Sequence, residues 1–530
     1  VPRVATDWER DAGTKKWQEL DATLCFVDIS GFTNLSEKLA RRGRIGAEEL
    51  TGVLNFVFGR MLERTYLQGG SLLKFGGDAL LLMFTGYDHA TRAASAAVEM
   101  RAALRDAGSY ETSVGKLRLK MSVGIHSGTI HLFRTGVSHS ELVIAGPGGT
   151  TTTEMEHTAD PGEIVVSSWT KERLPDGAAT TPKGAGWILK WRKAHCIAPG
   201  PVVREDRDED AVRAWVPTAL RDYLSAGSPE PEHRIATIGF VRFCGIDARM
   251  EVEGPEWVAN ALDLTVEAIQ SAADSEDVTF LATDVNEDGG KVILAAGAPA
   301  AREDDEGRIL RALRRIADVD TPLDLHIGVN RGHVFTGEVG TEYRSTYTVM
   351  GDTVNLSARL MAAAPAHQIY ATPSVLDQSG TLYGTETLEP FYVKGKEEPV
   401  HAYGVGFEIG DRPKDARTGL PFVGRRSEVE EVASAIREAE EGVGSVITVI
   451  GETGVGKSRL VRQACAQAPG VPIVDVHAEP FGAATPYRPF RDPLRLILGI
   501  ERGTQEEMLS LIHISEPTRP APLSRMPSSA

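Results

Sequence analysis

The stretch LCFVDISGFT, residues 24–33, is an apolar run that ends in an acid and a turn. Its successive apolar residues predict a buried strand, and Ser-Gly after Asp28 predicts a turn before the next helical pattern. A carboxylate at a strand end, beside free backbone N–H groups, can hold a hard cation against a phosphate. Asp28 is therefore a candidate metal ligand.

A second acid follows in LLKFGGDALLLMF, residues 72–84. Gly76 and Gly77 predict a tight hairpin turn between two apolar strands, which places Asp78 at the tip, beside the end of the first strand. An aspartate after a strand is also a common turn former or helix cap. Because two acids converge on one gap, we favour a site for a pair of divalent metal ions.

The residues between and after these motifs predict helices. Residues 46–68 carry apolar side chains at helical spacing, namely Leu50, Val53, Leu54, Val57, Phe58, Met61 and Leu62. A further helical pattern begins at residue 88 and precedes the strand LRLKMSVGIH, residues 117–126. The order is strand, helices, hairpin, helix and strand, an α/β (α+β) pattern of the β-α-β-β-α-β type.

DISGFT followed by KFGGD resembles the two metal-binding motifs of class III nucleotide cyclases, especially the tandem, soluble adenylyl cyclase type. The resemblance covers roughly residues 21–408 and implies ferredoxin-like cyclase domains. It implies that Asp28 and Asp78 hold two Mg²⁺ (or Mn²⁺) ions, with the Ile29 carbonyl as a further ligand. It also assigns substrate contacts to Gly31, Phe32 and Thr33.

The composition excludes several classes of protein. In the 530 residues, 57 lysines and arginines stand against 74 acids, and the net charge of -17 disfavours nucleic-acid or anionic-membrane binding. The four cysteines match no zinc spacing, no apolar run approaches the ~20 residues of a membrane span, and no signal peptide is evident. We expect a cytoplasmic protein. Its first residue is Val1, which leaves the true N-terminus open.

The chain contains a long internal repeat. LCFVDISGF aligns with IGFVRFCGI, which places Asp28 on Arg242, and KFGGDALLL aligns with EDGGKVILA, which places Asp78 on Lys291. SVGIHSGTI aligns with HIGVNRGHV, and LVIAGPGGT with YTVMGDTVN. Two copies of one domain in one chain predict an intramolecular pseudo-dimer. The expected boundaries are a lead-in (1–20), the first cyclase domain (21–200), a linker (201–232), the second cyclase domain (233–408), a linker (409–421), a truncated ATPase domain (422–508) and a tail (509–530).

The two copies have diverged in complementary ways. The second has Arg242 and Lys291 where the first has its metal acids. Its TVMGDTVNLSAR instead carries Asn355 and Arg359, one helical turn apart. By resemblance, Asn355 positions the ribose and Arg359 stabilises charge on the transition-state phosphate. The counterparts in the first copy, Thr150 and Glu154, suit neither role, so one competent site and one degenerate site are expected.

Base recognition departs from the resemblance. Adenylyl cyclases present a lysine to the adenine, whereas VNEDGGKV places Glu287 or Asp288 there, and a carboxylate would suit guanine donors. A register slip in this hairpin would bring Lys291 within reach instead. Thr348 matches the adenine-side residue of soluble adenylyl cyclases, and ATP is the preferred substrate.

Two further lysine positions are implied by the resemblance alone. Lys394 or Lys396, in VKGKEE, resembles the lysine that contacts the triphosphate. Lys74 matches a regulatory lysine that helps to hold bicarbonate in the soluble adenylyl cyclases. The arginine expected with it falls at Thr153, which argues against a bicarbonate response.

A nucleotide-binding loop follows the repeat. SVITVI predicts a β-branched strand that leads into GETGVGKS, residues 451–458, and a helix follows, as a P-loop requires. Mg-ATP would be held by Gly451, Gly454, Gly456, Lys457 and Ser458. The segment resembles an AAA-like regulatory ATPase of the signal-transduction type. Asp475 is a poor candidate for its Walker B acid, and the residues from about 509 resemble appended, non-native sequence.

These motifs favour an adenylate cyclase that makes cyclic AMP and pyrophosphate at one site between its two cyclase domains, regulated by a C-terminal ATPase. A guanylate cyclase is one alternative. Another is an inactive cyclase pair that serves as the nucleotide-sensing module of a signalling ATPase. The sequence indicates no particular regulatory protein partner.

Overall fold

The computed structural model divides the chain into two compact units, Val1–Arg412 and Pro413–Ala530. It describes residues 1–31, 35, 38–39, 44–106, 110–117, 119–191, 212–225, 231–302, 304–341, 344–392, 399–412, 424–450, 457–468, 470–471 and 473. Several predicted site residues lie outside these ranges, namely Phe32, Thr33, Lys394, Lys396, Gly451, Gly454 and Gly456, as does Asp475.

The first unit contains two large mixed sheets of the same topology. The first has the order β2-β3-β1-β6-β8-β10-β9, with β7 paired to β6. Its strands are β1 (Trp17–Ser30), β2 (Ser71–Gly76), β3 (Ala79–Thr85), β6 (Lys120–Thr135), β7 (Glu141–Ile144), β8 (Ile164–Val166), β9 (Ala179–Lys183) and β10 (Gly186–Leu189). A separate small hairpin consists of β4 (Tyr110–Thr112) and β5 (Gly115–Leu117).

The second sheet repeats this order as β12-β13-β11-β14-β16-β18-β17, with β15 paired to β14. Its strands are β11 (Glu232–Cys244), β12 (Thr279–Asn286), β13 (Gly289–Ala296), β14 (Asp324–Thr341), β15 (Arg344–Met350), β16 (Gln368–Ala371), β17 (Thr381–Thr387) and β18 (Tyr403–Asp411). The internal repeat found in the sequence is thus a repeat of structure.

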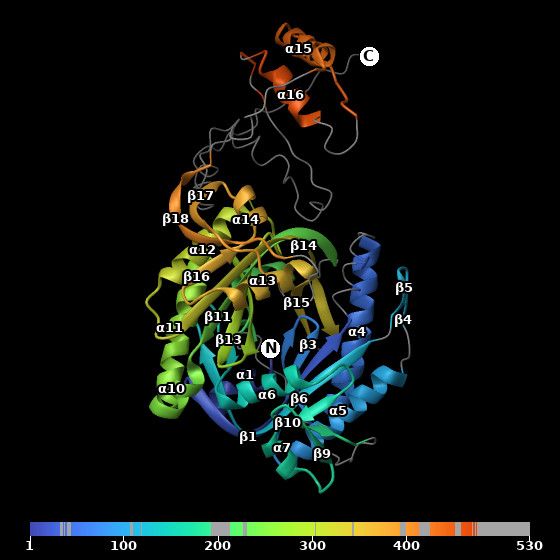
Figure 1. Cartoon of the computed structure of the whole chain (residues 1–530), viewed down its shortest axis with the longest axis vertical. Helices are drawn as coiled ribbons and strands as arrows, with labels where there is room; N and C mark the ends of the chain where they lie inside the picture. The colour runs from blue at the N-terminus through green and yellow to red at the C-terminus, as the bar shows by residue number, and fades with distance from the viewer. Residues whose placement is uncertain are drawn as a thin grey trace, which may run out of the picture. The chain divides into compact units, whose positions relative to one another are not determined.

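Helices accompany both sheets (Figure 1). Those of the first copy are α1 (Arg3–Thr6), α2 (Trp8–Asp11), α4 (Arg44–Leu67), α5 (His89–Asp106), α6 (Pro147–Thr158) and α7 (Ser168–Arg173). Those that follow are α9 (Thr218–Ser225), α10 (Ile246–Glu253), α11 (Pro255–Ser275), α12 (Asp305–Asp318), α13 (Asp352–Ala363) and α14 (Pro373–Gln378). The predicted helices at 46–68 and from residue 88 correspond to α4 and α5.

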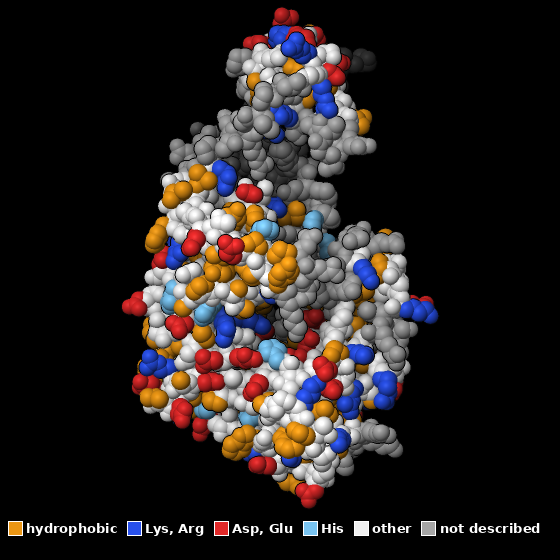
Figure 2. Space-filling model, in the orientation of Figure 1, with side chains coloured by type: hydrophobic (Ala, Val, Ile, Leu, Met, Phe, Trp, Pro, Cys, Tyr) orange, Lys and Arg blue, Asp and Glu red, His pale blue; other side chains and the backbone are white. Residues whose placement is uncertain are grey.

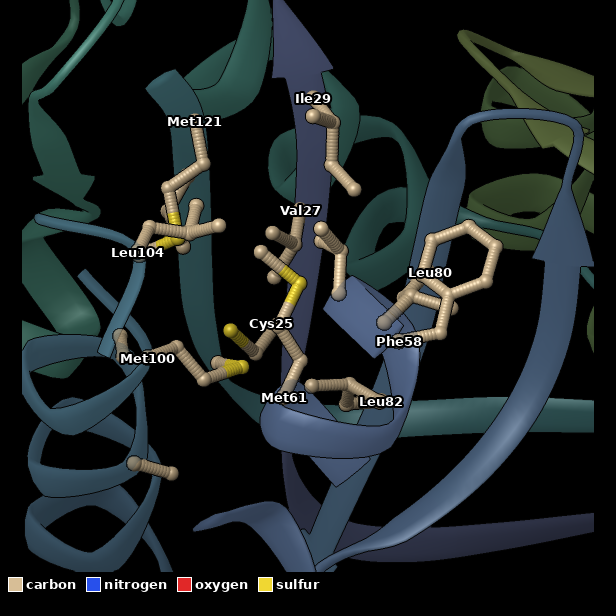
Figure 3. Close-up of a cluster of buried hydrophobic side chains, with 14 of the residues drawn as sticks. Cys25, Val27, Ile29, Phe58, Met61, Leu80, Leu82, Met100, Leu104 and Met121 are labelled. Carbon is tan, nitrogen blue, oxygen red and sulfur yellow. The ribbon is translucent and has the colours of Figure 1, made fainter. Parts of the chain in front are cut away.

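The core of the first copy follows from the alternation of side chains along β1. Cys25, Val27 and Ile29 are buried on the face that packs against α4 and α5, as Figure 3 shows. Asp28 falls on the opposite face because successive strand residues point to opposite sides. The opposite face also buries Leu24 and Phe26 in a second hydrophobic cluster, and Asp28 follows them near the end of the strand.

Strand pairing confirms the expected α/β (α+β) fold. β1 lies between β3 and β6 and is antiparallel to both, with Asp28 opposite Ala79 and Ser122. The β2–β3 hairpin turns at Gly77 and Asp78, and Gly77 has a positive φ of 71°. Glycine tolerates that conformation because it has no Cβ. Asp78 is thus at the hairpin tip, as predicted.

The structure shows more order than expected at the lead-in and the linker. The lead-in contributes α1, α2 and the start of β1, and Trp8 is only 1% exposed. Within the linker, Leu220 of α9 is buried against the second copy, and the rings of Trp8 and Trp215 lie 6.3 Å apart. Burial of these large apolar side chains explains why both segments pack onto the domains.

The described part of the second unit contains α15 (Arg426–Glu440) and α16 (Lys457–Cys465), which pack through Val429, Ala433, Leu460 and Ala464. The strand predicted for SVITVI is not formed: residues 443–450 have no regular structure, and Val446 is 95% exposed. A strand needs neighbours for its backbone hydrogen bonds, and the described residues of this unit supply no strand beside it.

The surface carries a mixture of charges. On the face drawn in Figure 2, Lys and Arg side chains lie among Asp, Glu and hydrophobic side chains. This mixture accords with the net charge of -17 and gives that face no broad basic surface of the kind that binds nucleic acid. Among the helices of the described ranges, none has the length and apolar character to span a bilayer.

Candidate active site

A cavity of about 530 Å³ lies between the two copies in the first unit. The first copy lines it from β1, the β2–β3 turn and α6, and the second copy lines it from β11, β12, β13, β15 and α13. Neither copy contains this cavity alone.

Asp28 and Asp78 both line this cavity. They are brought together because the backbone N–H of Ile29 donates a 3.3 Å hydrogen bond to the carbonyl of Asp78. Burial, assisted by the nearby charge of Glu156, raises the pKa of Asp78 to about 6, although Lys291 acts in the opposite direction. The side chain of Ile29 lies in the core, 1% exposed, so only its backbone can face a ligand.

Glu156 is a third acid of the cavity, and the sequence did not single it out. It is 8% exposed, and Ser122 Oγ donates a 2.8 Å hydrogen bond to its Oε1. Ser122 is itself opposite Asp28 in the β1–β6 pairing. Glu154, two residues earlier on α6, is exposed. A helical period through α6 could have separated the two glutamates.

The second copy provides a lysine, a carboxylate and a hydroxyl on the other side of the cavity. Lys291 Nζ of β13 lies 3.0 Å from Asp284 Oδ2 of β12, and Thr348 of β15 also lines the cavity. Asp284 is 8% exposed. Sequence reasoning missed Asp284, whose pairing with Lys291 depends on the strand register.

The hairpin register corrects the predicted repeat alignment. Lys291 is opposite Arg242, whereas Ala79 is opposite Asp28, so Lys291 is equivalent to Ala79 and not to Asp78. The second hairpin turns at Glu287 and Asp288 and extends beyond the equivalent point of the first. A shift of one residue changes the face of a strand side chain, which explains why Lys291 lies in the cavity.

Asp288, predicted to contact the base, is placed elsewhere. Its carboxylate accepts hydrogen bonds from the backbone N–H groups of Gly245 (2.9 Å) and Asp247 (2.8 Å), at the start of α10. It is not among the cavity-lining residues of the described chain. Glu287 pairs with His157 at 2.8 Å and does not line the cavity either. The structure therefore agrees with the alternative register, in which Lys291, and neither Glu287 nor Asp288, lies in the cavity.

The predicted polar pair of the second copy lies on α13. Asn355 lines the cavity, whereas Arg359, one turn later, is not among its lining residues in the described chain. The Nη1 atom of Arg359 is buried, and the described residues offer it no hydrogen-bond partner. A buried guanidinium donor without a partner is costly, and a bound anion would satisfy it.

The degenerate side of the interface contains hydrogen bonds of its own. Thr150, the counterpart of Asn355, accepts a 2.8 Å hydrogen bond from the backbone N–H of Asp288. Arg242, the counterpart of Asp28, donates to the Glu287 carbonyl at 3.3 Å. Thr153 is buried and bonds the carbonyl of Gly149 at 3.2 Å. Arg242 Nε is nonetheless buried without a hydrogen-bond partner among the described residues.

The remaining predicted residues are placed as follows. Gly31 follows β1 in a turn with φ of 98°. Lys74, in β2, pairs with Glu141 at 3.5 Å and does not line the cavity. Lys457 is the first residue of α16 and Ser458 the second, so the predicted helix after the P-loop is present.

Comparisons with known proteins agree with this architecture. The family model "Adenylate and Guanylate cyclase catalytic domain" matches residues 15–188 and 234–405, and the "AAA ATPase domain" model matches residues 421–521. The chain is 26% identical over 508 residues to adenylate cyclase type 10 of Homo sapiens and 24% identical over 521 residues to that of Oryctolagus cuniculus. These alignments cover 83% and 84% of this chain but 30% of each relative.

Among solved structures, a class III adenylyl cyclase-like ATP-binding protein from Pseudomonas aeruginosa has the same fold, with a TM-score of 0.51 at 11% identity. The match covers 68% of this chain and 85% of that one. The family model covers more than half of the chain and coincides with the two repeated sheets that enclose the cavity. The chain therefore belongs to the family of adenylate and guanylate cyclase catalytic domains, present here as a tandem pair followed by an AAA ATPase domain.

Proposed function

We propose that this chain is an adenylate cyclase, which converts ATP to 3′,5′-cyclic AMP and pyrophosphate in the cavity between its two copies. One observation carries the proposal: the cavity is lined by Asp28 and Asp78 from one copy and by Lys291, Thr348 and Asn355 from the other. Random decay of a duplicated domain would not leave complementary residues on both sides of a single cavity.

The donor set fits two divalent cations completed by a nucleotide. No group of three His, Cys, Asp or Glu side chains in the described ranges forms a ready metal cage. Mg²⁺ is commonly held by one or two carboxylates together with substrate phosphates, which matches Asp28, Asp78 and the Ile29 carbonyl. Bound Mg²⁺ or Mn²⁺ would supply Lewis-acid stabilisation of phosphate charge.

The remaining roles fall to residues of the second copy. Asn355 orients the ribose, and the buried Nη1 of Arg359 donates to the phosphate that gains charge. Lys291 donates to adenine N1 while Asp284 holds the ammonium in place, and Thr348 completes the base side. Guanine carries a hydrogen on N1, so its donor would meet a donor. These contacts support ATP over GTP.

The experiment is to incubate residues 1–412 with Mg²⁺ or Mn²⁺ and either ATP or GTP, and to identify the products by mass spectrometry. We expect cyclic AMP from ATP and much less cyclic GMP from GTP. Predominant cyclic GMP would identify a guanylate cyclase. No cyclic product from either nucleotide would leave the pair as a nucleotide-sensing module and refute the proposal.

The second unit is proposed to bind Mg-ATP and to regulate the cyclase pair. The helix that follows the P-loop, α16, begins at Lys457, and helix N-termini favour phosphate binding. Lys457 and Ser458, with the loop glycines 451, 454 and 456, would hold the phosphates. Lys457→Ala in the full chain should abolish ATP binding by this unit, measured as the loss of one of the two ATP-binding sites.

A further inference from the structure

A buried ion pair lies beside the active-site cavity without lining it. Lys74 of β2 and Glu141 of β7 approach to 3.5 Å, with side chains 10% and 9% exposed. Burial lowers the pKa of Lys74, opposed by Glu141 and Asp284. Burial alone would raise the pKa of Glu141, but Lys74 and His139 reverse this and hold it below its ordinary value. Each charge thus depends on the other.

This pair extends across the interface to β12 of the second copy. Lys74 Nζ donates to the Thr283 carbonyl at 2.8 Å and also contacts the Thr283 hydroxyl. The Thr283 hydroxyl donates to Glu141 Oε2 at 2.7 Å. Behind Glu141, His139 Nε2 lies 3.4 Å from its Oε1, and Gln270 donates to the His139 carbonyl at 3.0 Å. Buried polar groups are therefore bonded on both sides of the interface.

The residue after Thr283 is Asp284, the partner of Lys291. Beside it, the backbone of β2 passes so close that a Cβ on Gly76 would lie 3.3 Å from Asp284 Oδ2. Lys74 and Gly76 belong to the strand that leads to the turn carrying Asp78. The strand β2 thus approaches Asp284, the partner of Lys291, and also leads into the turn that carries Asp78.

We propose that Lys74 is a positioning residue for base selection: by holding the β12 backbone at Thr283, it fixes Asp284 and, through it, the orientation of Lys291. Glu141 supplies the compensating charge. This inference rests on the proposed role of the cavity as the nucleotide site. The Glu141 carboxylate already neutralises Lys74, so the pair serves structure and not the binding of a free anion.

The test measures base selectivity by binding, so that it does not depend on turnover. The full chain carrying Lys457→Ala, which removes the nucleotide site proposed for the second unit, is titrated with 3′-deoxy-ATP and with 3′-deoxy-GTP, which lack the attacking hydroxyl, and the ratio of the two Kd values is compared among variants. Lys74→Met combined with Glu141→Gln removes both charges and avoids an unpaired buried carboxylate. The matched control, Lys116→Met with Glu111→Gln, removes an exposed pair of 3.1 Å in the same copy.

We expect the Lys74/Glu141 double variant to lower the preference for the adenine nucleotide by ~5-fold or more, and the control to leave it unchanged. Because Lys74 acts through Lys291, adding the double variant to Lys291→Ala should produce no further loss. An unchanged preference in the folded double variant, or a full additional loss in the Lys291→Ala background, would overturn the proposal.

A second variant covers the case in which the double variant does not fold. Thr283→Val keeps the carbonyl and the side-chain volume but removes the hydroxyl that contacts Lys74 and Glu141. It should lower the preference by ~2-fold to 3-fold, and Thr283→Ser should restore it. A wild-type chain without base preference also refutes the inference. Selective binding without cyclic product would instead refute the proposed function alone.

Discussion

Asp28 and Asp78 place two carboxylates at one side of a cavity, where burial works against the charge of Asp78 and raises its pKa. A divalent cation would offset that cost, so we expect Asp28→Ala or Asp78→Ala to lower kcat more than ~100-fold while the fold is retained. Cyclic AMP formation and thermal melting check both parts. Glu154→Ala, which changes an exposed acid of α6, should retain near-wild-type turnover. If all three variants had comparable turnover, Asp28 and Asp78 would not be ligands of a catalytic metal ion.

Lys291 is the residue on which base selection should depend. Lys291→Ala removes the proposed donor to adenine N1 and the ion-pair partner of the buried Asp284, so the ratio of kcat/KM for ATP to that for GTP should fall by ~10-fold or more. Asp288→Asn, which keeps an acceptor at the start of α10, is the control and should leave the ratio unchanged. If Asp288→Asn lowered the ratio and Lys291→Ala did not, Asp288 and not Lys291 would be the residue that contacts the base.

At the scale of single elements, the β12–β13 turn supports α10. Asp288 accepts two backbone N–H groups at the N-terminus of this helix, the role of a helix cap supplied by a distant residue. Asp288→Ala should lower the free energy of unfolding by about 1–2 kcal/mol, because two donors lose their acceptor and alanine is strained at a φ of 56°. Urea denaturation measures the change, and an unaltered midpoint would contradict this account.

The helices α6 and α13 occupy equivalent places in the two copies but carry different side chains. Arg359 on α13 has a buried donor without a partner among the described residues, whereas its counterpart Glu154 is exposed. We expect Arg359→Ala to lower kcat by ~100-fold with a smaller effect on KM, because its charge matters most when negative charge develops. Steady-state kinetics separate the two parameters. A change confined to KM would indicate a role in ground-state binding only.

At the scale of the whole molecule, both halves of the site lie in the unit Val1–Arg412. We therefore expect residues 1–412 to retain kcat within about twofold of the full chain, assayed without ATPase effectors. A loss of turnover on removal of the second unit, with melting unchanged, would show that this unit is required for catalysis itself and not only for its regulation.

The sequence alone determined the order of elements, the duplication and three of the polar residues that meet in the cavity, Asp28, Asp78 and Asn355. The apolar periodicity of α4 and the continuous apolar run of β1 are local properties that can be read from each segment without its neighbours. The sequence also showed that the second copy lacks the counterpart of Asp28 and that the first copy lacks the counterpart of Asn355, because an alignment of the two copies is enough to reveal both differences. The strand predicted at SVITVI failed because strand formation depends on partners elsewhere.

Only the tertiary structure decided which groups share the cavity. Lys291 faces the cavity because the second hairpin turns at a different point from the first. For the same reason, Asp288 accepts hydrogen bonds at the start of α10. Glu156, Asp284 and the Lys74–Glu141 pair gain their partners through packing between segments far apart in the sequence. Sequence periodicity determines the face of a side chain within its own element, but the register between elements and the contact between domains determine what that face meets.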